Sequence, residues 1–100
     1  MRLIVRPEAE ADLAQAYDWY EDQRVGLGRE FMEEASRCLQ SIEQRPLSFA
    51  RVDEMAHRAI LHRFPYALFF VASTEEISVV AAFHMARHPD ALSLRLAPDA

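Results

Sequence analysis

The spacing of apolar residues divides the chain into a helical half and a strand half. Between positions 7 and 45, apolar side chains recur at i, i+3, i+4 and i+7, which is the spacing of one helix face. Two such stripes follow one another, the first made of Leu13, Ala16, Tyr17 and Tyr20 and the second of Phe31, Ala35, Cys38 and Ile42. The sequence therefore predicts two consecutive helices, with these stripes facing a common core.

Proline and glycine set the predicted limits of the two helices. Pro7 suits the first turn of a helix, where its missing N–H costs nothing. The segment GLG at 26–28 follows Gln23 and breaks the helix, because glycine adopts the backbone conformations that a tight connection needs. Pro46 ends the second helix. The short link predicts a helical hairpin.

After Pro46 the pattern becomes that of strands. We expect strands at 58–64, 66–73 and 77–85, the last two joined by the polar link STEE and therefore antiparallel. The strand at 66–73 is apolar on both faces and is expected in the centre. With a further strand at 2–5, the prediction is an α+β domain over 1–100: an N-terminal strand, a helical hairpin, then an antiparallel sheet of three strands with the helices packed on one face.

Composition limits the classes of protein that the chain can belong to. A content of 51% hydrophobic and 27% charged residues is typical of a globular domain. No apolar stretch approaches the roughly 20 residues of a membrane span, and the start MRLIVRPEAEAD lacks the apolar centre of a secretory signal. A lone Cys38 cannot form an internal disulfide. We therefore expect a cytoplasmic protein without a membrane partner.

The charge of the chain also restricts its partners. The net charge is −5, which argues against strong direct binding along a nucleic-acid backbone. The sequence contains no lysine, so all 11 fixed positive charges are guanidinium groups. These groups suit bidentate or stacked contacts, although genomic base composition is the simpler explanation of the absence of lysine.

The segment VVAAFHMARHP at 79–89 raises the question of a metal site, because His84 and His88 stand four residues apart. In extended chain this spacing does not bring two imidazoles together, and no cysteine or carboxylate cluster is near, so we expect neither a metal nor a cofactor. His84 is either a hydrogen-bonded structural histidine or a functional one. Arg87 either faces a partner or forms a solvated pair with Asp90.

Five segments of the sequence together resemble a known family. They are VRPEAEADL at 5–13, WYEDQRVGLGREF at 19–31, RFPY at 63–66, HMARHP at 84–89 and the late Arg95. In this order they are similar to the RelE/ParE toxin superfamily, in its ParE-like or plasmid stabilisation branch. The resemblance implies a bacterial toxin of a type II toxin-antitoxin pair, neutralised by an antitoxin whose C-terminal segment wraps its surface.

The superfamily contains ribosome-dependent RNases, which cut messenger RNA, and ParE-type toxins, which block DNA gyrase. An RNase of this kind would use Arg58, Arg63, His84 and Arg87. However, Ala67 stands where the RNase branch often has an arginine, and the tail APDA lacks a terminal aromatic or basic side chain. We therefore expect a toxin without catalytic residues that acts by binding a target, DNA gyrase. The alternatives are the RNase and a non-toxic member that still binds antitoxin.

The expected partner-binding residues are drawn from both halves of the chain. Trp19 is more simply a packing residue but is also a suitable interface anchor. The basic group around Arg58 and Arg63 is either a solvated strand face or an edge where a peptide pairs. The segment at 83–89 is expected to end a strand and project side chains toward the partner, with the tail at 91–100 over the sheet or mobile. The predicted set is Trp19, Arg58, Arg63, His84, Arg87 and Arg95.

Overall fold

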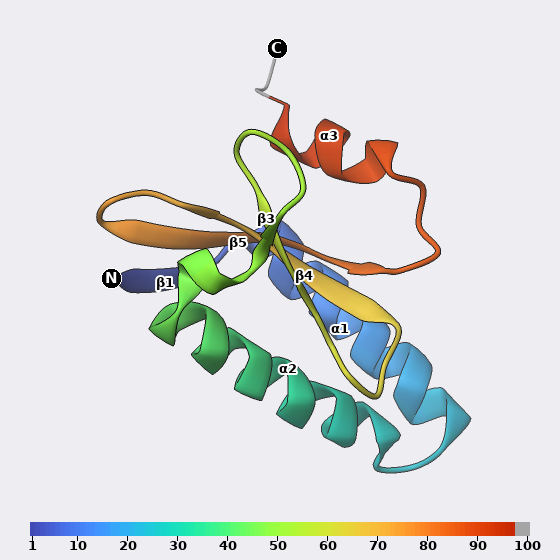
Figure 1. Ribbon diagram of the computed structural model, residues 1–100. Helices are drawn as coiled ribbons and strands as arrows, with labels where there is room; N and C mark the ends of the chain where they lie inside the picture. The colour runs from blue at the N-terminus through green and yellow to red at the C-terminus, as the bar shows by residue number, and fades with distance from the viewer. Residues whose placement is uncertain (98–100) are drawn as a thin grey trace.

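The computed structural model describes residues 1–97, which form a five-stranded sheet with helices on both faces (Figure 1). The strand order is β1-β5-β4-β3-β2, with β1 parallel to β5 and the other neighbours antiparallel. The elements in chain order are β1 (Arg2–Val5), α1 (Pro7–Gln23), α2 (Leu27–Gln44), the 3-10 turn η1 (Pro46–Ser48), β2 (Ala50–Arg51), β3 (His57–Ile60), β4 (Tyr66–Ala72), β5 (Glu76–His84) and α3 (Asp90–Leu96).

The helical hairpin and the α+β class are confirmed. α1 begins with Pro7 in its first turn, and Gly26 in the link has φ of 91°, a conformation that favours glycine. The Glu21 carboxylate accepts hydrogen bonds from the backbone N–H groups of Gly26 and Gly28 at 2.9 and 3.0 Å. Gly28 also lies so close to α1 that a Cβ there would be 2.7 Å from the backbone oxygen of Tyr17. The turn is therefore fixed by one carboxylate and by close backbone approach.

The core lies between this hairpin and one face of the sheet. Both predicted stripes supply it, although Tyr17 is 36% exposed and lies at its margin. Cys38 is partly buried against the core, and this burial, followed by the charge of Glu34, raises the pKa of its thiol to about 11. β4 lies between β3 and β5, as expected for a strand apolar on both faces. The largest fully buried side chains are Phe31, Phe70, Ile42, Leu68, Ile77 and Val79.

Two features of the sheet differ from the prediction. The sheet has five strands, because the N-terminal strand joins it beside β5 and the two-residue β2 adds the far edge. β3 ends at Ile60, whereas we expected a strand to position 64. The physical reason is the buried carboxylate of Glu34, which accepts hydrogen bonds from the backbone N–H groups of His62 and Arg63 and turns the chain out of the sheet.

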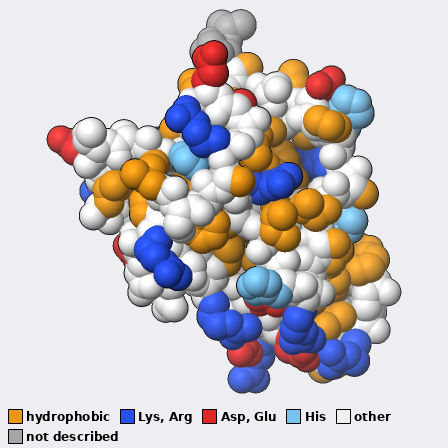
Figure 2. Space-filling model, viewed as in Figure 1, with side chains coloured by type: hydrophobic (Ala, Val, Ile, Leu, Met, Phe, Trp, Pro, Cys, Tyr) orange, Lys and Arg blue, Asp and Glu red, His pale blue; other side chains and the backbone are white. Residues whose placement is uncertain are grey.

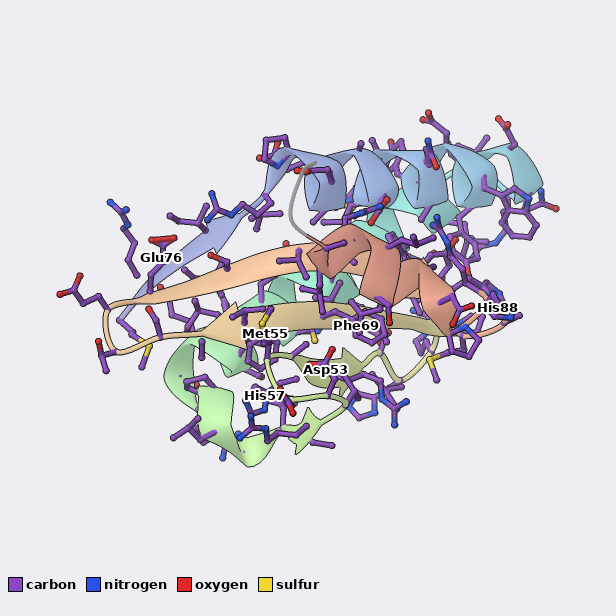
Figure 3. All side chains as sticks on the ribbon, turned by 90° about the horizontal axis from the view of Figure 1, so that it is seen from above. Asp53, Met55, His57, Phe69, Glu76 and His88 are labelled. Carbon is purple, nitrogen blue, oxygen red and sulfur yellow. The ribbon has the colours of Figure 1, made fainter. Side chains whose placement is uncertain are left out.

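The C-terminal segment was expected to lie over the sheet or to move, and it instead contains α3, on the face opposite the hairpin (Figure 1). Its helical form was not predicted, and the last part of the tail lies outside the described residues. α3 lies across the end of β5, close to Phe69 of β4, when the molecule is seen from above (Figure 3). The helix therefore forms one wall above a sheet face that the hairpin does not cover.

Candidate partner-binding surface

Two hollows adjoin where β4 and β5 approach the start of α3. The first, the α3 hollow, has a volume of about 250 Å³ and lies between α3, the β2–β3 loop and the sheet. The second, the Trp19 hollow, is also about 250 Å³ and lies between α1 and the end of β5. His84 and Arg87 line both. In Figure 2 hydrophobic and arginine side chains lie together on the surface below α3.

The floor of the α3 hollow is aromatic. Phe69 and Phe83 project from neighbouring strands, with ring centroids 5.7 Å apart. The guanidinium of Arg87 lies 4.2 Å from the centroid of the Phe83 ring, within the range of a cation–π contact. This contact holds the exposed Arg87 side chain over the floor, so the positive charge lies at the rim of an apolar surface.

Arg58 carries the strongest signal of an unfilled site. Its Nε atom is buried, and it has no hydrogen-bond partner within residues 1–97. Neither Arg58 nor Arg87 forms an ion pair in the described part of the chain, and no Asp or Glu there lines the α3 hollow. A buried donor without a partner costs roughly 1–3 kcal/mol. A ligand carboxylate or phosphate oxygen in the hollow would accept charge-assisted hydrogen bonds from the guanidinium groups that line it.

His84 makes a structural hydrogen bond and also lines both hollows. Its Nδ1 accepts a hydrogen bond from the backbone N–H of Ala86 at 3.0 Å, which shapes the turn after β5 and leaves Nε2 as the donor of the neutral ring. The ring stands edge-on to Tyr66, with centroids 5.3 Å apart. Burial, followed by the charge of Asp12, raises the pKa of the Tyr66 hydroxyl. His84 is thus held in place structurally while its outer edge lines both hollows.

Trp19 is more accessible than packing alone would explain. It is 58% exposed, and it stands edge-on against the buried Tyr20 with ring centroids 5.1 Å apart. Tyr20 itself is a core residue, as predicted. Trp19 lines its hollow together with His84 and Arg87. The structure therefore brings four of the predicted residues to one surface: Trp19, Arg58, His84 and Arg87.

Arg63 lies elsewhere. The prediction that it shares a strand with Arg58 is wrong, because it belongs to the loop after β3. Its guanidinium donates to Glu30 at 2.8 Å and lies 5.2 Å from the centroid of the Phe64 ring. The hydrogen bond from Arg63, followed by that from Arg24, lowers the pKa of the Glu30 carboxyl. The charge of Arg63 is already offset by a carboxylate beside the α1–α2 turn.

Arg95 points inward instead of toward a partner. Its side chain is 19% exposed and pairs with Asp12, whose side chain is 11% exposed. Arg95 also donates to the backbone oxygen of Val80 at 2.8 Å, and Asp12 accepts from the N–H of Ala82 at 3.0 Å. β1 ends opposite Val79. Beyond that point the side chains of Asp12 and Arg95, instead of a neighbouring strand, form hydrogen bonds with the backbone at the edge of β5. Sequence reasoning missed Asp12, because nothing in its local pattern marks a contact with β5.

Neither a metal cluster nor a membrane helix is found in the described chain. Within residues 1–97 no three His, Cys, Asp or Glu side chains gather as metal ligands would. Nδ1 of His88 instead accepts a hydrogen bond from the N–H of Asp90 at 3.1 Å. Across the same residues, no helix has the length and apolar content needed to cross a membrane.

Comparisons with known proteins give a match at the level of structure. No family model and no curated protein matches the sequence. A solved structure, the chromosomal ParDE TA system from P. aeruginosa, contains a chain that superposes with a TM-score of 0.76 at 19% sequence identity. The match covers 84% of this chain and 95% of that chain. The chain has a ParE-like fold. The expected arrangement of strand, helical hairpin and sheet is therefore confirmed. In this fold the α3 hollow lies on the sheet face opposite the hairpin, and the Trp19 hollow lies beside α1.

Proposed function

We propose that this protein is the toxin of a bacterial type II toxin-antitoxin pair. It acts in the cytoplasm by binding, with DNA gyrase as the target, and a cognate antitoxin neutralises it. The observation that carries the proposal is the α3 hollow, in which Arg58 and Arg87, neither of which forms an ion pair within residues 1–97, flank an aromatic floor. The ParE-like fold supports the assignment, since the structure it matches is a ParDE TA system.

The chemistry of the surface favours a peptide that is both acidic and apolar. Two guanidinium groups suit a carboxylate, because each can donate two parallel hydrogen bonds. Phe69, Phe83 and the exposed Trp19 suit aliphatic or aromatic side chains beside that carboxylate. An antitoxin segment of this composition would fill both hollows with one continuous chain.

The geometry supports the RNase alternative less well. Of the four residues that it would use, Arg63 lies in a separate ion pair, which leaves Arg58, His84 and Arg87. His84 uses Nδ1 for the turn and offers only Nε2 to a substrate. Two arginines and one imidazole suit binding better than proton transfer at both the attacking and leaving oxygens, and the other imidazole that lines the α3 hollow, His88, is not among the four expected residues.

The proposal is tested by expression, supercoiling and translation assays. We expect induced protein to arrest growth and purified protein to inhibit gyrase-dependent supercoiling, and co-expression of an adjacent antitoxin gene to relieve both effects. Arg58→Ala/Arg87→Ala should weaken antitoxin binding by at least about tenfold, while Arg29→Ala, an exposed arginine on α2, should not. Toe-printing on translating ribosomes decides the alternative. Codon-specific cuts that disappear in His84→Ala would overturn the binding mechanism in favour of the RNase, and full growth with intact antitoxin binding would show a non-toxic member.

A further inference from the structure

A larger hollow lies along the open part of the opposite sheet edge. It has a volume of about 520 Å³ and is bounded by the C-terminal half of α2, by η1 and by the end of β3. We name it the α2–β3 groove. Its lining includes Arg37, Cys38, Arg45, Phe49, Ile60 and His62.

The backbone of β3 is available for pairing at this groove. β2 pairs only with His57 and Arg58, so the outer ladder ends there. The N–H of Leu61 donates inward to Tyr66, and hydrogen-bonding directions alternate along a strand, so the backbone groups of Ile60 face outward. Ile60 is 48% exposed. One outward-facing position of β3 therefore lies at the groove beyond the end of β2.

The side chains around this edge are basic and apolar. Arg37 and Arg45 are exposed and form no ion pair within residues 1–97, and the His62 imidazole lies beside them. The only acidic side chain among the groove's described lining is Glu34, whose oxygens already accept the N–H groups of His62 and Arg63. Phe49 and Cys38 supply the apolar wall. The groove therefore has uncompensated positive charge beside an apolar hollow.

From this arrangement we propose that the α2–β3 groove binds an extended acidic segment of a protein partner by strand addition to β3. Backbone pairing at Ile60 sets the direction of the segment, its carboxylates contact Arg37 and Arg45, and its alternate apolar side chains enter the hollow. This site is separate from the α3 hollow and does not depend on the proposed function.

Charge argues against two other occupants. A second copy of this chain, paired across the same edge, would bring Arg37 and Arg45 of both copies together, and like charges directly opposed are destabilising. A nucleic acid needs a longer track of positive charge than two arginines on a chain of net charge −5 provide. An acidic peptide can contact the arginine charges and can also pair with the outward-facing backbone of Ile60.

The test uses a fluorescein-labelled peptide of about eight residues in which valine and aspartate alternate, with binding followed by anisotropy. We expect a dissociation constant below about 1 mM, and at least fivefold weaker binding (roughly 1 kcal/mol) to Arg37→Glu/Arg45→Glu. The matched control Arg2→Glu/Arg29→Glu makes the same charge change at side chains that are 75% and 82% exposed outside the groove, and it should bind normally. Arg58→Ala should also bind normally, which separates this site from the α3 hollow.

A second peptide, N-methylated at alternate residues, keeps the charge but cannot pair with a strand. We expect it to lose binding, and we expect the N–H of Ile60 to gain protection from hydrogen exchange only with the unmethylated peptide. Equal binding of the two peptides, equal loss in both charge-reversal variants, or no binding below about 1 mM would each overturn strand addition at this groove. Thermal melts of every variant exclude unfolding as the cause of a loss.

Discussion

The guanidinium of Arg95 and the carboxylate of Asp12 meet at 3.0 and 3.2 Å, although 83 positions separate them in sequence. This pair joins α3 to α1 around the edge of β5. Arg95 also lies 5.0 Å from the centroid of the Phe83 ring, so the same side chain contacts the aromatic floor of the α3 hollow.

Removal of this pair should loosen α3 before it affects the hairpin. Arg95→Ala leaves the largely buried Asp12 carboxylate without its cation, and we expect a loss of about 3 kcal/mol in the free energy of unfolding. Urea denaturation measures that loss. The control Arg29→Ala breaks an exposed pair and should cost less than about 1 kcal/mol. If Arg95→Ala and Arg29→Ala had the same free energy of unfolding, the Arg95–Asp12 pair would stabilise the fold no more than an exposed pair does.

The two glycines of the α1–α2 turn should differ in their response to alanine. Gly26→Ala meets no atom within 4 Å but must adopt φ of 91°, at a cost of about 1–2 kcal/mol. Gly28→Ala places Cβ 2.7 Å from the Tyr17 oxygen, which forces the helices apart at a cost of about 2–3 kcal/mol. Chemical denaturation of both variants tests the order. A larger effect at Gly26 would show that the helices can separate easily.

Glu34 should be far more important than its neighbour Glu33. Glu34→Ala leaves the N–H groups of His62 and Arg63 without their acceptor, and we expect a loss of about 2–3 kcal/mol in the free energy of unfolding. Within residues 1–97 Glu33 makes only an exposed pair with Arg29, so Glu33→Ala should be nearly neutral. Hydrogen exchange at the amide of His62 provides a second readout, since it should accelerate in Glu34→Ala alone.

The thiol of Cys38 should react slowly at neutral pH. Its pKa is raised to about 11 by burial, so at pH 8 the thiolate fraction is about a hundredfold below that of a cysteine with the ordinary value of 9.0. Iodoacetamide labelling should accelerate about tenfold per pH unit up to that pKa. The pKa of this thiol is higher in the folded protein than in the unfolded protein. Its contribution to the free energy of unfolding is therefore fully present below the ordinary pKa of 9.0 and is lost as the pH rises through about 11. Rapid labelling at pH 8 in a protein that remains folded would contradict this environment.

The sequence predicted those parts of the fold that depend on local periodicity. The stripes that end in Tyr20 and Ile42 repeat within single helices, so their buried faces could be inferred from spacing alone. The parallel pairing of β1 with β5, the short β2 and the Asp12–Arg95 contact depend on which distant segments meet. Local pattern contains no information on that choice.

The candidate site was predicted only in part, because it also depends on which distant segments meet. His84 and Arg87 are close in sequence, and their shared location followed from the end of one strand. Arg63 was assigned to the wrong neighbour, because the carboxylate of Glu34 that ends β3 lies 29 residues earlier. An arginine in or near a strand looks the same in sequence whether it forms no ion pair, as Arg58 within the described residues, or forms one, as Arg63 does.

His84 and Arg87 belong to the walls of both the α3 hollow and the Trp19 hollow. Two separate molecules, one in each hollow, would both have to contact the single guanidinium of Arg87. One chain that passes from the first hollow to the second would contact it without a competitor. Under the proposed function, antitoxin and target would then compete for the same arginine. Neutralisation would follow from simple displacement, with no rearrangement of the toxin's fold.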